Sequence, residues 1–305
     1  MWRMKNLSEK VFAIIVAAII LCQLAEARKR ALTVFIGDYP ENSGWSNIHS
    51  LNDKTIILNS LETVGFQAND IICLENSAAT RKAIDAAFER LILSCRPGDQ
   101  VYVHFSCHGQ LITDVNGDEA LRYARDRYDE SLVPYDAAVE YGKNGYDGAK
   151  HLVDDAVNEY LCGIEDKVGK KGSVLVVFDA CHSGDARREY SDDVDVEYVR
   201  GFAQPFELPS TGKLLEETPR EAKCVTISAC RDFESNYECK VGGVMYGRLS
   251  YAVSRALRPG ITAAQLRDSI EEVYQELSSS SPLRQGRTQN IVYHYSSDYS
   301  NRKLF

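Results

Sequence analysis

The sequence predicts an α/β fold: a mostly parallel central β-sheet of about six strands with helices on both faces. Short apolar runs of the kind that form buried strands alternate along the chain with amphipathic helical patterns. This alternation favours a parallel sheet that is covered on both sides. The chain has 305 residues, 44% of them hydrophobic, which is enough for a sizeable core. No internal repeat or second hydrophobic unit is evident, so we expect one domain.

The first half of the chain contains three predicted strands and two predicted helices. The strands are expected at 31–36, 70–74 and 100–106, and the helices at 52–64 and between Thr80 and Pro97. Asn52 or Asp53 is the expected N-cap of the first helix, and Gly65 lies just past its end. The region 109–150 is acidic, rich in Gly and Tyr, and without clear periodicity. Loops of that length inside a compact domain are usually functional or mobile.

The second half continues the alternation. We expect helices at 154–168, 246–257 and 263–277, and strands at 173–178, 223–229 and 290–295. Thr262 is the expected cap of the last helix. The segment 185–222 is a second long irregular stretch, with runs of charge and three prolines. Its low apolar content leaves little to hold it against the core, so it is a candidate processing linker, a segment at which the chain is cut.

The N-terminus has the pattern of a secretory signal peptide. Arg3, Lys5 and Lys10 precede an apolar run at 11–21, and Ala25-Glu26-Ala27 follows as a small-x-small cleavage site. We therefore expect a signal peptide at 1–27 and a mature domain at 28–305, either secreted or periplasmic. The apolar run is short for a membrane span, so no stable span is expected after cleavage. An uncleaved anchor is the alternative.

Charge and cysteine content limit the classes of partner and the redox chemistry. The net charge of −9 argues against nucleic acid and favours basic peptides. Of nine cysteines, Cys22 would leave with the signal. Several of the remaining eight lie in or beside apolar strands, where a free thiol behaves as a small hydrophobe. At most a few disulfides are expected, and the sequence does not identify them.

Two strands end in chemically reactive residues. One delivers His108, followed by Gly109, and another delivers Cys181, followed by His182. Ligands of open α/β sheets bind beyond the carboxyl ends of the strands, so a Cys/His pair is possible there. A cysteine attacks as its thiolate and needs a nearby base, which His108 can provide. The N–H groups of Gly109 and Cys181 could form an oxyanion hole. His182 is a competing base, but neighbours on an extended chain point to opposite faces.

Other interpretations of these strand ends remain open. A cysteine or histidine at the end of a strand is often a packing residue or part of a satisfied hydrogen bond. A catalytically silent fold that binds basic peptides or partner proteins is the main alternative to an enzyme. A serine hydrolase is disfavoured because the chain has no Gly-x-Ser-x-Gly motif.

The two strand-end motifs resemble those of a known family. His104-Phe-Ser-Cys-His108-Gly and Asp179-Ala-Cys181-His-Ser-Gly are similar to the two signatures of the metacaspases and related bacterial caspase-like cysteine peptidases. Weaker similarity extends over most of the mature chain, at 51–53, 128–134, 153–155, 227–232 and 246–252. The resemblance implies a caspase-like fold and an endopeptidase, with His108 as general base and acid and Cys181 as nucleophile.

The resemblance also implies a preference for Arg or Lys at P1, the residue before the cut. Asp53 and Asp179 would form the acidic base of the S1 pocket that receives this side chain. A carboxylate two residues before Cys181 lies on the same face of the strand. Two carboxylates suit the planar fork of Arg and also accept Lys. Ser106 is a further candidate for the pocket wall. The alternative for Asp53 is a helix N-cap.

Calcium is the one cofactor that the resemblance suggests, although none is required for the chemistry. Many metacaspases bind calcium through clustered aspartates, and Asp129, Asp154 and Asp155 match three such positions. Oxygen ligands of this kind suit Ca²⁺. The fourth position of the family corresponds to about Arg188, a cation that would repel the metal. Asp154 and Asp155 could instead simply favour the start of a helix.

An exported peptidase needs restraint inside the cell, so we expect a zymogen. The segment 185–222 offers Arg187, Arg188, Arg200 and Lys213 as cleavage sites for the enzyme's own S1 pocket. Arg187 and Arg188 are close to Cys181 in sequence, which hinders their return to the site. The bond after Arg200 is favoured, because the glycine that follows it leaves the backbone adaptable. Cleavage by another protease is the alternative.

Overall fold

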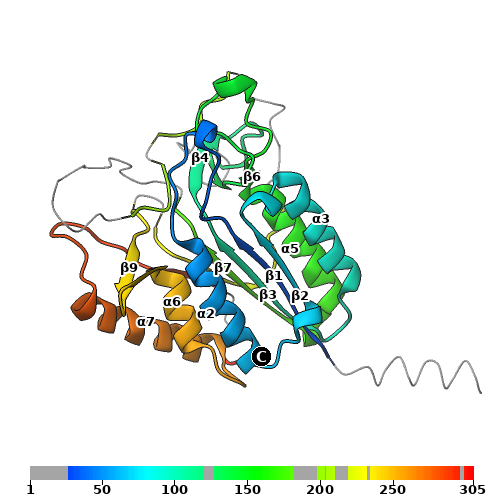
Figure 1. Ribbon diagram of the computed structural model, residues 1–305. Coiled ribbons are helices and arrows are strands. Elements are labelled where there is room, and N and C mark those ends of the chain that lie inside the picture. The colour runs from blue at the N-terminus through cyan, green and yellow to red at the C-terminus, as the bar shows by residue number, and fades with distance from the viewer. Residues whose placement is uncertain are drawn as a thin grey trace, which may run out of the picture.

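The centre of the molecule is a six-stranded β-sheet. The computed structural model describes residues 27–119, 127–181, 198–202, 204–209, 219–231, 234–295 and 299–305. Strand order in the sheet is β11–β8–β7–β3–β1–β2, and β11 alone runs antiparallel to its neighbour (Figure 1). The strands are β1 (Lys29–Phe35), β2 (Ile71–Glu75), β3 (Gln100–Ser106), β7 (Ser173–Asp179), β8 (Val225–Ser228) and β11 (Val292–His294). The predicted fold class is confirmed.

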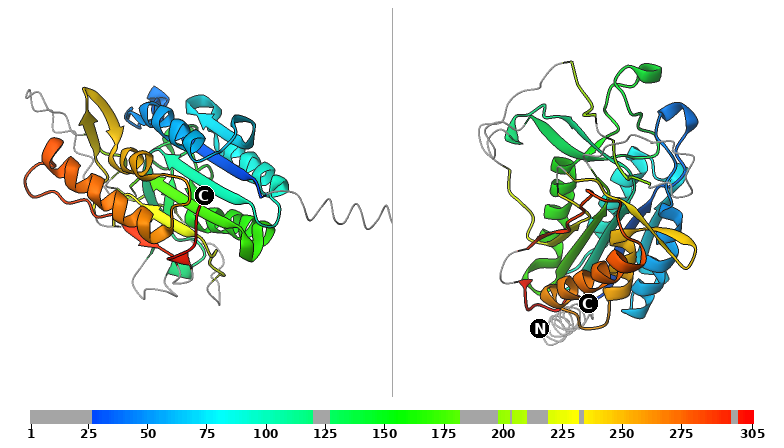
Figure 2. Two further views of the ribbon diagram at one scale, coloured as in Figure 1. Left: turned by 90° about the horizontal axis from the view of Figure 1, so that it is seen from below. Right: turned by 90° about the vertical axis from the view of Figure 1, so that its left-hand side faces the viewer.

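Helices cover both faces of this sheet. Figures 1 and 2 show α3 (Arg81–Ser94) and α5 (Asp154–Val168) on one face. On the other lie α2 (Ser50–Thr63), α6 (Arg248–Ala256) and α7 (Ala263–Ser280). Alternate side chains of each strand enter opposite cores: Val103 packs on the α3 and α5 side, and Tyr102 on the α2 and α6 side.

Two of the predicted helix caps are confirmed, and one is wrong. Thr80 accepts a hydrogen bond from the Ala83 N–H at the start of α3. Thr262 forms a capping box with Gln265 at the start of α7. Helix α2 begins at Ser50 rather than at Asn52 or Asp53, so the predicted N-cap is wrong. The Asp53 carboxylate points away from its own helix, toward partners elsewhere in the fold.

Five short strands lie outside the predicted set. The region 109–150, expected to be a loop, contains β4 (Gly109–Thr113) and β5 (Tyr128–Leu132), and β6 (Leu152–Val153) follows just after it; the three form an antiparallel sheet. A hairpin of β9 (Glu238–Val241) and β10 (Val244–Gly247) precedes α6, which starts later than predicted. Polar residues such as Asp129 and Ser131 are buried in these strands, so the hydrophobic pattern that marks a strand is missing.

The register of the main sheet assembles polar groups at one edge. Phe35 lies opposite Ser106, and Ser106 lies opposite Asp179, at the carboxyl ends of β1, β3 and β7. The chain leaves β3 through His108 and continues directly into β4, so the small sheet borders this edge. The carboxyl ends of the parallel strands therefore carry the candidate site, as expected for an open α/β sheet.

The described part of the chain also tests two expectations, one about disulfides and one about membrane-spanning helices. The eight cysteines in it are all free thiols, so the few disulfides that the sequence allowed are not found there. No helix among the described residues is both long and apolar enough to cross a bilayer. The predicted signal peptide at 1–27 lies outside the described residues except for its last one.

Candidate active site

His108 is buried and oriented from two sides. Its Nε2 lies 2.8 Å from the Ser46 carbonyl oxygen, and because a carbonyl can only accept, Nε2 carries the proton. The ring stacks on Trp45 with centroids 4.9 Å apart, and its backbone N–H donates to the Tyr39 hydroxyl. Nδ1 has no hydrogen-bond partner among the described residues. Burial lowers the pKa of His108 to about 4, although the Ser46 carbonyl opposes this shift. The ring is therefore neutral at pH 7, with the Nδ1 lone pair available.

Cys181 lies just past the end of β7, buried beside the same edge. Its thiol donates to the Glu234 carbonyl oxygen at 2.9 Å. Its backbone N–H donates to the Arg200 carbonyl oxygen at 2.9 Å, and the Gly109 N–H donates to that same oxygen at 3.3 Å. The two N–H groups expected to form an oxyanion hole thus converge on one carbonyl.

The segment around Arg200 lies across the site as an extended peptide. Val199 pairs antiparallel with Tyr237. The Arg200 N–H donates to the Asn236 carbonyl, and the Glu238 N–H donates to the Tyr198 carbonyl, each at 3.0 Å. This pairing extends a sheet edge by one short strand, a common mode of peptide recognition.

Gly201 lies directly against Cys181. A Cβ atom at Gly201 would lie 2.5 Å from the Cys181 carbonyl oxygen and 3.0 Å from the Cys181 Cβ. Backbone atoms cannot move aside as a flexible side chain can, so the approach requires a glycine. The peptide bond between Arg200 and Gly201 is therefore held beside the candidate nucleophile.

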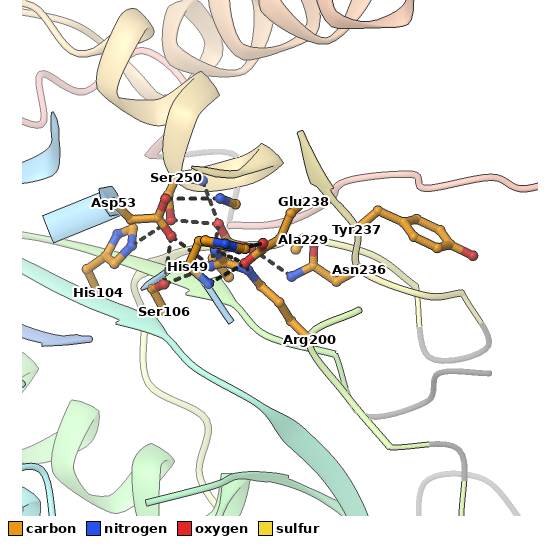
Figure 3. A network of polar contacts seen from close by, with 12 residues as sticks. His49, Asp53, His104, Ser106, Arg200, Ala229, Asn236, Tyr237, Glu238 and Ser250 are labelled. Carbon is orange, nitrogen blue, oxygen red and sulfur yellow. Dashed lines mark hydrogen bonds and ion pairs between the residues drawn. The ribbon is translucent and has the colours of Figure 1, made fainter. Parts of the chain in front are cut away.

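The Arg200 side chain is fully buried in an acidic pocket (Figure 3). Its Nη1 lies 2.8 Å from Asp53 Oδ2, 3.4 Å from Asp179 Oδ2 and 2.7 Å from the Ser106 hydroxyl. Its Nη2 lies 2.9 Å from Glu238 Oε1. The structure thus brings together the three residues expected to form the S1 pocket, and adds Glu238, which sequence reasoning missed.

Each carboxylate of the pocket is held by donors from another element. Asp53 accepts from the Gly247 N–H and the Ser106 hydroxyl, so its expected alternative role as a helix N-cap is wrong. Asp179 accepts from the Ser250 N–H and hydroxyl at 2.7 and 2.6 Å. The pocket is consequently built by α2, β3, β7, the β9–β10 hairpin and α6.

Two further side chains complete this support. The Asn236 amide donates to Asp179 Oδ1 at 2.7 Å. The backbone N–H of His49 lies 2.8 Å from Glu238 Oε1, and its ring Nδ1 lies 2.5 Å from Glu238 Oε2. No motif in the sequence marks these residues: His49 and Glu238 are 189 positions apart, and the stretch around Glu238 was not predicted to be a strand.

The charges in the pocket are not balanced. Three carboxylates face one guanidinium. Burial raises the pKa of Asp53 to about 7, although Arg200 opposes this. Burial would also raise the pKa of Glu238, but Arg200 and His49 outweigh it and lower that pKa. The hydrogen bond from the His49 ring to Glu238 raises the pKa of His49. The pocket therefore favours a cation, and Asp53 changes its protonation near neutral pH.

A second acidic cluster lies where β4 ends and β5 begins. Oxygens of Asp114, Asp118 and Asp129 all lie within 4.8 Å of one another. Asp129 Oδ1 is buried and without a hydrogen-bond partner in the described part of the chain. Burial, and then the charge of Asp154, raise the pKa of Asp129 to about 8. The structure thus groups Asp129 with two aspartates that the sequence analysis did not single out.

The other expected calcium ligands stand beside this group. Asp154 and Asp155 form the first turn of α5, and Asp155 Oδ2 accepts from the Asn116 side chain. A set of carboxylate oxygens with one unpartnered, buried oxygen suits a hard cation such as Ca²⁺. His182, Arg187, Arg188 and Lys213, each assigned a role from the sequence, lie outside the described residues.

Comparisons with known proteins identify the family of this chain. A family model described as metacaspase, peptidase C14 domain, matches residues 29–188, just over half of the chain. Metacaspase-1 of Mycosarcoma maydis is 22% identical over 85% of this chain and 72% of its own length. Metacaspase-1B of Aspergillus fumigatus is 31% identical over 61% of this chain. This chain spans only 41% of that relative.

Two solved structures share the fold at low identity. A protein from Geobacter sulfurreducens matches 90% of this chain and 97% of its own, with a TM-score of 0.57 at 19% identity. Caspase-1 from Spodoptera frugiperda matches 88% of this chain and 89% of its own, with a TM-score of 0.53 at 13% identity. The family match favours an enzyme over a silent binding module. The chain belongs to the metacaspase family and is a cysteine-type endopeptidase.

Proposed function

We propose that this peptidase cuts after Arg or Lys through Cys181 and His108, and that the bond between Arg200 and Gly201 is one of its own cleavage sites. One observation carries the proposal. The Arg200 carbonyl oxygen accepts from the N–H groups of Gly109 and Cys181, while its guanidinium lies among buried carboxylates. A substrate needs the same two contacts, one at the reacting carbonyl and one at the P1 side chain.

The proposed reaction uses His108 as the proton carrier. The Cys181 side chain exchanges its bond to the Glu234 carbonyl for one to His108 Nδ1, which takes the thiol proton. The thiolate then attacks the carbonyl carbon of P1, and the Gly109 and Cys181 N–H groups bind the oxyanion. The imidazolium gives its proton to the leaving amine. Water, deprotonated by His108, finally hydrolyses the thioester.

Replacement of Cys181 by alanine is expected to abolish peptidase activity without unfolding the protein, because the sulfur forms the covalent intermediate. His108→Ala should be nearly as severe. The measurement uses purified mature protein and fluorogenic peptides that end in Arg. Circular dichroism of each variant reports on the fold. Activity of Cys181→Ala near that of the wild type would contradict the assignment.

The same proteins test self-cleavage. Incubation of the wild type should yield a fragment that starts at Gly201, identified by intact mass and N-terminal sequencing, and Cys181→Ala should stay whole. Gly201→Ala is the matched control: its Cβ would clash with Cys181, so self-cleavage should fail. In short fluorogenic peptides a planar dye without a Cβ takes that position, so these peptides should still be cut. A wild type that is active on peptides yet never cleaved would refute this step.

Activity on Arg peptides is expected to rise as the pH increases from about 7. Burial raises the pKa of Asp53 to about 7 even with Arg200 in the pocket, and the charge of Arg200 lowers this pKa. In a pocket without Arg200, Asp53 therefore stays mostly protonated up to at least this pH, and the pocket attracts a cation more strongly once it ionises. His108, with a pKa of about 4, stays neutral across the range. The profile of kcat/KM from pH 5.5 to 8.5 should lose this rise in Asp53→Asn. Persistence of the rise in that variant would contradict the assignment.

The charge of the pocket also predicts rejection of an acidic P1. Asp53, Asp179 and Glu238 would face a fourth carboxylate at short range, which costs several kcal/mol for desolvated like charges. Peptides that end in Asp should therefore show no turnover under conditions that cleave Arg peptides. Their efficient cleavage would argue against an S1 pocket at this place.

We further propose that the acidic cluster of Asp114, Asp118 and Asp129 binds Ca²⁺. The unpartnered buried oxygen of Asp129 supports this. Ca²⁺ should raise the melting temperature of the Cys181→Ala protein, because a ligand of the folded state stabilises it by mass action. The rise should vanish in an added Asp129→Asn substitution but persist with Asp268→Asn, which alters a carboxylate exposed on α7. Equal shifts in all three proteins would exclude the cluster.

Export is proposed on the pattern of residues 1–27. The basic start, the short apolar run and Ala25-Glu26-Ala27 support it. Protein recovered from outside the cytoplasm of an expressing cell should begin near Arg28 by N-terminal sequencing. Protein that keeps Met1 and stays in the cytoplasm would overturn the proposal.

A further inference from the structure

We propose that Glu238 makes the pocket select arginine over lysine. The proposal rests on the proposed cleavage after basic residues, and adds to it the group that tells the two apart. Neither the motifs nor the predicted pocket residues include Glu238. Its carboxylate lies in the same buried pocket as Asp53 and Asp179, but it contacts a different part of the Arg200 side chain.

The two ends of the guanidinium have separate partners. Nη1 meets Asp53, Asp179 and the Ser106 hydroxyl. On the other side, Glu238 Oε1 accepts from both Nε, at 3.2 Å, and Nη2, at 2.9 Å. The planar fork of an arginine is thus bound along two of its edges, with one carboxylate assigned to the Nε edge.

A lysine can satisfy only one of these two sets. Its single nitrogen, at the tip of the side chain, can reach the Nη1 position and so meet Asp53, Asp179 and Ser106. It has no equivalent of Nε–H or of a second terminal nitrogen. Glu238 would then be a buried carboxylate without a bond to the substrate. Leaving one partner of a buried pair unsatisfied is costly, so lysine binds with a penalty that arginine avoids.

Glu238 is held too firmly to move toward a lysine. The His49 backbone N–H donates to Oε1, and the His49 ring binds Oε2. Its own N–H donates to the Tyr198 carbonyl, one of the main-chain bonds that align the bound segment. The pocket wall at Gly247 lies close to the guanidinium, because a Cβ there would lie 2.4 Å from Arg200 Nη1. This leaves little room for water to replace the contacts that a lysine cannot make with Glu238.

The experiment compares two fluorogenic peptides that differ only in ending with Arg or Lys. The measured quantity is the ratio of their kcat/KM values for one enzyme preparation. Any unfolded fraction, and any competition from Arg200 for the pocket, affects both peptides equally and cancels in this ratio. The wild type should favour Arg. Glu238→Ala should lower the ratio about tenfold or more, because charged hydrogen bonds are lost only for arginine.

A second variant and a matched control complete the test. Glu238→Gln keeps the side chain's volume and one acceptor oxygen, and should lower the ratio by less than Glu238→Ala. Ser106→Ala removes a contact at the Nη1 position, which both substrates use, so both kcat/KM values should fall and the ratio should stay within about twofold. That pattern distinguishes a specific role of Glu238, which binds the Nε edge of arginine, from a general loss of pocket structure.

Two results would count against the ideas, in different ways. A ratio unchanged in both Glu238 variants, while the wild type cleaves basic peptides, overturns the role of Glu238 and leaves the proposed function intact. A wild type that cleaves neither the Arg nor the Lys peptide overturns the proposed function itself.

Discussion

The buried guanidinium of Arg200 and the three carboxylates around it form the interaction on which the geometry of the site depends. The carboxylates come from α2, from the end of β7 and from the start of β9. A buried ion pair is favourable only when its geometry is good and its remaining hydrogen bonds are made. Here the donors that satisfy the carboxylates come from β3, from the end of β10 and from α6. The charged cluster therefore fixes the positions of these elements relative to one another.

The same cluster links recognition of a side chain to the position of the proposed scissile bond. The guanidinium is anchored at one end of Arg200, and the carbonyl oxygen is held by two N–H groups at the other. Main-chain bonds between Arg200 and Asn236 and between Tyr198 and Glu238 align this segment. Because all these contacts act on one short segment, a change in the pocket is expected to shift the carbonyl relative to the sulfur. Specificity and catalysis are thus expected to be lost together in many pocket variants.

His108 depends on a different part of the fold. Its ring is held by the loop between β1 and α2, through the Ser46 carbonyl and the face of Trp45. This loop places the proton on Nε2 and leaves Nδ1 as the proposed base, in the way that a third group orients the base in other nucleophilic enzymes. The loop ends at His49, whose ring binds Glu238. A single loop therefore orients the base and also steadies one wall of the acidic pocket.

Much of this arrangement could be predicted from the chain alone. The hydrophobic strands that bring His108 and Cys181 to one sheet edge follow from apolar runs with polar ends, because parallel strands align their carboxyl ends. Asp179 follows from the alternation of side chains along a strand, and Arg200 from its position next to a glycine in a segment of low apolar content. These signals are local in sequence, which is why they can be read without a structure.

What only the tertiary structure decided lies in contacts between distant segments. Glu238 joins the pocket because β9 pairs with β10 beside α2, and its partner His49 is 189 residues away. Asp114 and Asp118 meet Asp129 through strands whose buried faces carry polar residues. Such strands lack the hydrophobic alternation by which a strand is recognised. The sequence by itself determined the strand ends that carry the cysteine and the histidine; the packing of short polar strands decided which charges surround them.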